Sequence, residues 1–90
     1  MKIKHISAQV FSDTTEMTFS LDENCIIQIT VYNSQGEVVK TLMNQNLLEG
    51  DHQVNWDGTD NFLNFLPNGS YIIEIKTENE LETISVLISR

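Results

Sequence analysis

Turn-forming residues divide this chain into short segments, and that division limits the folds available to it more than any other feature of the sequence. Between the turns, polar and apolar residues alternate with the two-residue period of a β-strand, and no longer segment has the 3.6-residue period of a helix. The turns recur about every 8–12 residues, a spacing typical of an antiparallel sandwich. The expected strands are residues 3–10, 15–21, 25–32, 37–43, 52–56, 70–77 and 81–88. The pattern therefore predicts an all-β, immunoglobulin-like antiparallel β-sandwich of about seven strands.

The same alternation predicts the core. Segments 15–21 and 25–32 each place bulky apolar side chains on one face, and β-branched residues dominate the second segment. The expected inward-facing residues are Met17, Phe19, Leu21, Ile27, Ile29, Val31, Val54, Trp56, Tyr71, Ile73 and Ile75. The less regular segment 3–10 is expected at a sheet edge, since an edge strand has only one neighbour to satisfy.

The length and net charge of the chain limit the number of domains and the classes of partner. A chain of 90 residues is expected to form one domain, residues 1–90, because it is too short to bury two cores. Its formal net charge of −8 repels phosphate backbones and anionic lipid, so we expect no nucleic-acid and no membrane partner. Neither a signal peptide nor a membrane-spanning segment is visible in the sequence.

Residues 57–68 form the longest segment without a strand pattern, and they contain four large apolar residues. These four are Phe62, Leu63, Phe65 and Leu66. One interpretation is a lid that folds back over the end of the sandwich, and the other is an exposed patch that docks a protein partner. We favour the lid, and we name these residues as the protein-interaction candidates if the loop is instead exposed.

Oxygen-bearing side chains at the start of the same loop raise the question of a metal site. Asp57, Asp60 and Asn61 could offer oxygen ligands to Ca²⁺, but they lack the regular spacing and the closing Glu of a dedicated calcium loop. The favoured alternative is that Asp57 caps a turn through the local main chain, that Gly58 takes a positive φ, and that Asp60 and Asn61 are solvated. We therefore predict no metal and no cofactor.

No set of residues in the sequence indicates catalysis. His5 and His52 lie far apart and have no clustered cysteines or carboxylates beside them, so a zinc site is not expected. His52 is expected to be a partly buried sheet residue. Cys25 begins an apolar strand without a basic neighbour and is expected to act as a small buried hydrophobe. The sequence predicts that the protein is not an enzyme.

Three motifs in order resemble one known family. They are V-Y-x-x-x-G-x-x-V at residues 31–39, G-x-H-x-V-x-W-D-G at residues 50–58 and P-x-G-x-Y at residues 67–71. Together they resemble the FlgD-type immunoglobulin-like domain, the outer domain of the flagellar hook-capping scaffold protein. That family usually has Gly where Leu63 stands, and a Pro-Asn-Pro-Phe-like segment where residues 8–11 stand. The first departure concerns the shape of the 57–68 loop and the second the path of the first strand.

The resemblance implies a non-enzymatic scaffold or protein-interaction module of a bacterial extracellular or flagellar-type protein, with a protein partner or self-association. The C-terminal sorting domains of type 9 secretion cargo share the hairpin and the Gly-x-Tyr motif but generally lack Trp-Asp-Gly, so a structural spacer or sorting domain is the alternative. A third candidate is a carbohydrate-binding module that stacks sugars on Tyr32 or Phe62. An extracellular or cell-surface location follows from the resemblance alone.

Overall fold

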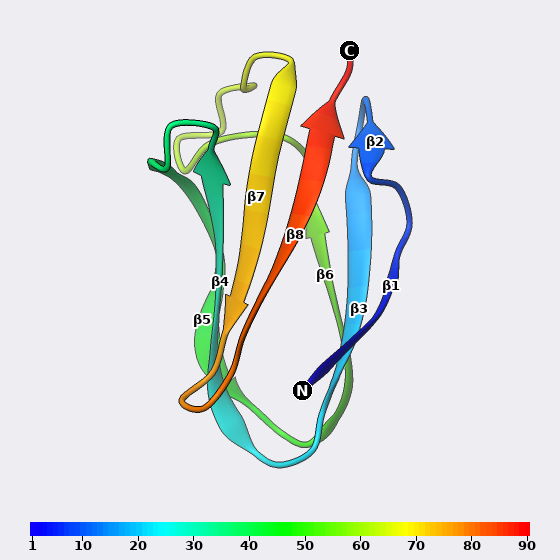
Figure 1. Cartoon of the computed structure of the whole chain (residues 1–90), viewed down its shortest axis with the longest axis vertical. Coiled ribbons are helices and arrows are strands. Elements are labelled where there is room, and N and C mark those ends of the chain that lie inside the picture. Colours follow the sequence, from blue (N-terminus) through cyan, green and yellow to red (C-terminus); the bar gives the residue numbers. More distant parts are fainter.

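The computed structural model describes residues 1–90 as two β-sheets packed face to face (Figure 1). The strands are β1 (Lys2–Ile6), β2 (Val10–Phe11), β3 (Thr15–Leu21), β4 (Cys25–Asn33), β5 (Val38–Leu47), β6 (Gly50–Trp56), β7 (Gly69–Lys76) and β8 (Leu81–Ile88). One sheet has three strands in the order β1-β3-β6, and the other has five in the order β2-β8-β7-β4-β5. All pairs are antiparallel except β2 with β8. The prediction of an all-β sandwich is confirmed, with eight strands rather than seven.

The additional strand arises because the N-terminal segment changes sheets. A single strand was expected over residues 3–10, but β1 pairs with β3 in the three-stranded sheet and β2 pairs with β8 in the other. Between them, the amide of Ser7 donates to the carbonyl of Glu16, and the carbonyl of Gln9 accepts from the amide of Leu87. The segment thus bridges the two sheets. β1 lies at the edge of its sheet, as expected.

Strand β5 continues further than predicted. The sequence indicated an end near Met43 because Asn44, Gln45 and Asn46 are polar, yet β5 runs to Leu47. Cross-strand pairing with β4 accounts for the difference, since the register continues without a break from Ile29↔Met43 to Cys25↔Leu47. The polar side chains of Asn44, Gln45 and Asn46 are tolerated because all three are exposed to water.

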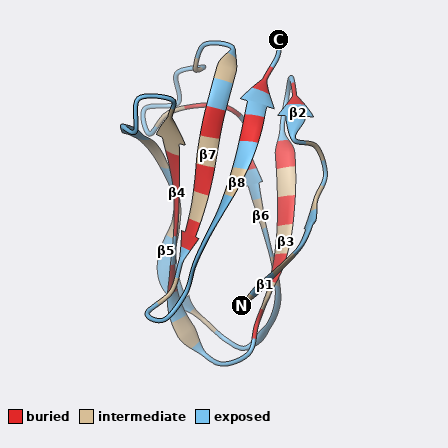
Figure 2. Cartoon of the chain, viewed as in Figure 1, coloured by how far each residue is buried: buried red, intermediate tan, exposed pale blue.

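The core lies where the strand alternation predicts it. Buried residues alternate with more exposed ones along β3 and β7, which appears as red bands in Figure 2. The buried apolar residues are Phe11, Met17, Phe19, Leu21, Ile27, Ile29, Val31, Trp56, Tyr71, Ile73, Ile75, Val86 and Ile88. Val54 is half-buried and packs against this cluster.

An aromatic group joins the two sheets at one end of the core. Trp56, from the three-stranded sheet, makes edge-to-face contacts with Phe11 and Tyr71, both from the five-stranded sheet, with ring centroids 5.5 Å apart in each pair. Such geometry is favoured by the quadrupoles of the rings. Phe11 lies outside the strands expected from the sequence, and the sheet change between β1 and β2 brings it into the core.

The two ends of the sandwich differ in composition. At the end where β6 finishes lie the 57–68 loop and the β4–β5 turn, and at the other lie the β3–β4, β5–β6 and β7–β8 turns with Met1 (Figure 1). We call the exposed residues Phe62, Leu63 and Phe65 the apolar tip. We call the opposite end, which carries Asp22, Glu23, Glu78 and Glu80, the acidic end.

Candidate functional site

Asp57 shapes the turn in which β6 ends and the loop begins. Its Oδ1 accepts hydrogen bonds from the amide of Thr59 at 3.1 Å and from the hydroxyl of Thr59 at 2.6 Å. The hydroxyl bond is the largest of the effects that lower the pKa of this carboxyl group. Gly58 has a φ of 76°, a conformation that glycine adopts at little cost. The predicted capping role of Asp57 is therefore confirmed.

Asp60 fixes the next part of the loop. Its Oδ1 accepts from the amide of Phe62 at 2.8 Å and from the amide of Asn64 at 3.0 Å. The amide of Asn64, followed by that of Phe62, holds the pKa of Asp60 below its ordinary value. The expectation that Asp60 is simply solvated is wrong, because its carboxylate organises residues 60–64.

Asn61 attaches the loop to the free edge of β5. Its amide donates to the carbonyl of Val39 at 3.2 Å, and its Oδ1 accepts from the amide of Thr41 at 3.0 Å. In this way Asn61 takes the place of a neighbouring strand beside β5. The expectation that Asn61 is only solvated is therefore wrong. Oxygens of Asp57, Asp60 and Asn61 thus bind the chain's own donors. No group of three or more His, Cys, Asp or Glu residues is arranged to hold a metal ion.

Leu63 adopts a left-handed backbone conformation with φ of 66°, the only such non-glycine residue in the chain. This conformation costs roughly 1–2 kcal/mol for a residue with a Cβ atom. Leu63 stands where the family that the sequence resembles usually has Gly. The loop therefore keeps a glycine-type backbone while it carries a large apolar side chain.

The apolar residues of the loop divide into one that packs and three that do not. The exposed fractions are 84% for Phe62, 73% for Leu63 and 74% for Phe65, whereas Leu66 is half-buried and packs against the core. The predicted lid is therefore wrong for three of the four residues.

The reason is that the end of the core is already closed beneath the loop. The indole nitrogen of Trp56 donates to the carbonyl of Thr59 at 3.0 Å, and the hydroxyl of Tyr71 donates to the carbonyl of Pro67 at 2.7 Å. These two aromatic residues cover the core and bind the main chain of the loop above them. Trp56 is 2% and Tyr71 6% exposed, so neither leaves apolar surface for Phe62 or Phe65 to cover.

Two cationic side chains, Arg90 and Lys40, donate hydrogen bonds to main-chain carbonyls of the loop. Arg90 donates to the carbonyl of Leu66 at 2.6 Å and to those of Asp57 and Gly58 at 3.3 Å each. Its guanidinium carbon also lies 4.8 Å from the centre of the Phe65 ring, a cation–π contact. Lys40 Nζ donates to the carbonyl of Asp60 at 2.9 Å. Sequence reasoning missed both residues, because nothing local in the sequence marks a cation whose partners lie so far along the chain.

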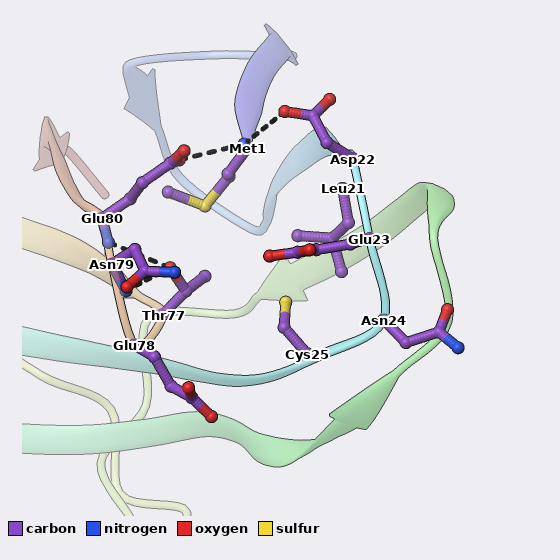
Figure 3. Close-up of a pocket in the computed structure, with 10 residues that line it drawn as sticks. All are labelled: Met1, Leu21, Asp22, Glu23, Asn24, Cys25, Thr77, Glu78, Asn79 and Glu80. Carbon is purple, nitrogen blue, oxygen red and sulfur yellow. Dashed lines mark hydrogen bonds and ion pairs between the residues drawn. The ribbon is translucent and has the colours of Figure 1, made fainter.

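The acidic end holds a small cavity of about 110 Å³ (Figure 3). The amino group of Met1 lies 2.9 Å from Glu80 Oε2 and 3.3 Å from Asp22 Oδ2. The hydrogen bond to Glu80 is the largest contribution to the raised pKa of this amino group. Cys25, which also lines the cavity, is half-buried rather than fully buried as predicted.

The histidines remain separate. His5 is exposed on β1. His52 is half-buried as predicted, its ring lies 5.8 Å from that of Phe19, and its Nε2 is 2.7 Å from the carbonyl of Leu48, to which it donates. Neither histidine lies in an arrangement for acid–base chemistry.

These features define an immunoglobulin-like β-sandwich module. The chain belongs to the FlgD Ig-like domain family, whose model matches residues 6–80. A solved structure of FLGD from P. aeruginosa is similar, with 27% sequence identity and a TM-score of 0.64 over 83% of this chain and 58% of that chain. Among curated proteins, none matches the chain. The structure has no helix of the length and hydrophobicity needed to cross a membrane.

Proposed function

We propose that this chain is a non-enzymatic protein-binding module of a flagellar hook-capping type of scaffold, working in an extracellular setting, and that the apolar tip is its contact surface. The observation that carries the proposal is the exposure of three large apolar side chains on one loop. Contiguous apolar residues left in water are typical of sites that bind protein.

The attachment of the loop supports a role in binding. Asp60 accepts from the amides of Phe62 and Asn64, and Asn61 attaches the loop to β5. Arg90 holds the base of the loop. A loop fixed in this way loses little conformational freedom when a partner arrives, so more of the contact energy appears as affinity. Aromatic side chains presented on a rigid base are also the residues that most often dominate binding energy.

Charge indicates the class of partner. The net charge of −8 disfavours nucleic acid and anionic membrane, as the sequence analysis expects. The cations nearest the tip, Lys40 and Arg90, bind main-chain carbonyls of the loop itself. A protein surface with an apolar pocket and a neutral or basic rim fits this tip best.

Two further functions remain as proposals. A structural spacer or C-terminal sorting module would use the fold without any tip contact. A carbohydrate-binding module would use Phe62 as a stacking platform, supported by its 84% exposed ring. Tyr32 suits that purpose less well, because it is half-buried and its hydroxyl is engaged with Glu74 at 3.4 Å.

Binding can be tested with the immobilised domain and the secreted or surface proteins of a flagellated bacterium, with captured proteins quantified by mass spectrometry. We expect Phe62→Ser to reduce retention of a specific partner at least about tenfold, a loss of about 1.4 kcal/mol. The melting temperature should be nearly unchanged because the side chain is exposed.

The matched control is Leu81→Ser, which removes an exposed apolar side chain from the other end of the molecule. Retention should survive that change. Equal retention by the wild type and by both Phe62→Ser and Leu63→Ser would contradict the proposal and favour the spacer. Retention on polysaccharide that is lost with Phe62→Ala would favour the carbohydrate-binding module.

A further inference from the structure

Strand β5 presents an edge that lacks the usual protection against strand pairing. It is the outermost strand of the five-stranded sheet, so one side of its backbone has no neighbouring strand. Proteins generally protect such edges with proline, with charged residues or with bulges. The ten residues of β5 contain no proline and a single charged residue, Lys40.

What protection exists is confined to the first half of the strand. Asn61 forms hydrogen bonds with the carbonyl of Val39 and the amide of Thr41, so these two groups are not free to pair with another strand. The two irregularities in the β4–β5 pairing, between Ile29 and Thr30 and between Val31 and Tyr32, lie at the same end. The second half, residues 43–47, pairs regularly with β4 and leaves its outer edge open.

The inner face of this second half is only partly covered, since Met43 and Leu47 pack against the core while Gln45 between them does not. Gln45 is paired with Ile27, so the two side chains lie on the same face of the sheet. Ile27 is fully buried, whereas Gln45 is exposed. The three-stranded sheet therefore leaves β5 uncovered at Gln45, and β5 lies at the margin of the sandwich seen in Figure 1.

We propose that residues 43–47 of β5 pair with the same residues of a second copy of this chain in antiparallel orientation. The sequence of this stretch, Met-Asn-Gln-Asn-Leu, reads nearly the same in both directions. A two-fold axis at Gln45 places Gln45 opposite Gln45 of the second copy, Asn44 opposite Asn46, and Met43 opposite Leu47. Amide then meets amide and apolar meets apolar, which is the self-complementarity that a two-fold interface requires.

The distribution of charge allows a second copy to occupy this edge. Copies that each carry a net charge of −8 repel one another over most of their surface. Yet β4, from Cys25 to Asn33, and residues 41–48 contain no charged residue. Two acidic copies can therefore approach here with little repulsion from the paired strands themselves.

The arrangement has a geometric consequence that does not depend on the proposed function. Antiparallel pairing of β5 joins the two five-stranded sheets into one continuous sheet across both copies. Because the strands run in opposite directions, the two apolar tips point to opposite ends of the dimer. With the apolar tip as the contact surface, as proposed above, one dimer would contact two partners at once.

Sedimentation equilibrium over a range of protein concentrations tests the pairing. We expect a concentration-dependent dimer for the wild type and a monomer for Gln45→Lys, because two lysines would meet at the axis. The matched control is Gln53→Lys on β6, an edge strand of the other sheet, which should remain a dimer. A wild type that stays monomeric at the highest concentration, or a Gln45→Lys variant that still dimerises, would overturn the proposal.

A cross-link tests the register. In a Cys25→Ser background, Gln45→Cys places two thiols directly opposite each other, within reach of a disulfide. We expect a covalent dimer under mild oxidation, and none from Gln53→Cys. Dimers in solution that yield no cross-link from Gln45→Cys would show that the copies meet elsewhere and would refute the β5 interface.

Discussion

The connections between strands differ at the two ends of the sandwich. At the acidic end, short polar turns join β3 to β4 and β7 to β8, and carboxylates project into water. At the other end, the 57–68 loop exposes Phe62, Leu63 and Phe65. Exposed carboxylates need no explanation beyond solubility. Exposed aromatic residues on an ordered loop do need one, so the comparison directs the search for function to the apolar tip.

The ends also differ in how they are attached to the rest of the molecule. The tip is built on Trp56, which is 2% exposed and bonds to the loop carbonyl of Thr59. The acidic end is held by ion pairs such as that between Met1 and Asp22, whose side chain is 87% exposed. Water and salt screen pairs between exposed charges, so they contribute little to stability. The end that carries the apolar tip is therefore the more firmly anchored of the two.

The largest expected effect tests this anchoring directly. Trp56→Ala should lower the free energy of unfolding by about 3–5 kcal/mol, because it removes a buried aromatic side chain and leaves a cavity. Glu23→Ala at the acidic end should change it by less than about 0.5 kcal/mol, since that side chain is exposed. Urea denaturation of both variants measures the difference. If both variants lost a similar free energy of unfolding, the two ends would be anchored equally well.

A smaller effect of opposite sign is expected at Leu63. Leu63→Gly should raise the free energy of unfolding by up to about 1 kcal/mol, because glycine relieves the left-handed strain, less its own entropic cost. Leu48 is a close match at the acidic end, with 71% exposure and no positive φ. Leu48→Gly should therefore be neutral or destabilising in the same denaturation experiment. A loss of stability in Leu63→Gly would mean that the leucine side chain stabilises the fold.

The smallest effect is a difference in pH dependence. The lowered pKa values of Asp57 and Asp60 mean that their contribution is present above the ordinary value of 3.8 and is lost as pH falls through the folded-state values. The raised pKa of the Met1 amino group means that its contribution is present below 8.0 and is lost as pH rises through the folded-state value. Acid should therefore reduce the stability contributed at the tip, and alkali should reduce the stability contributed at the acidic end.

Melting temperatures measured from acidic to alkaline pH test this assignment. Asp57→Asn keeps an acceptor for Thr59 but removes the titrating charge, so it should flatten the acid side of the profile alone. Acetylation of the Met1 amine should flatten the alkaline side alone. If Asp57→Asn altered the alkaline side instead, the assignment of the two pH limits to the two ends would be wrong.

Local pattern was sufficient for part of this structure. β3 and β8 have the predicted bounds because their alternation reports directly which side faces the core. Gly58 and Asp57 follow from turn chemistry within a few residues. In each case the cause lies inside the segment itself.

What the sequence could not predict depends on partners distant along the chain. The extension of β5 depends on its register with β4, and the short strand β2 exists only because β8 is beside it. The exposure of Phe62 depends on Trp56 and Tyr71 having already closed the core. The family resemblance correctly drew attention to Leu63, but only the backbone showed that the leucine adopts the conformation that a glycine would.

The parallel pairing of β2 with β8 determines how this domain would respond to force. A pull applied at Met1 and Arg90 would draw β2 and β8 in opposite directions along their common axis. The load would then fall together on the bonds that join them, including Leu87 N to Gln9 O at 2.7 Å and Ser89 N to Phe11 O at 2.9 Å. Bonds loaded in parallel must break together, whereas the bonds of a hairpin opened from its end break one after another. This short strand would thus make the module resistant to stretching.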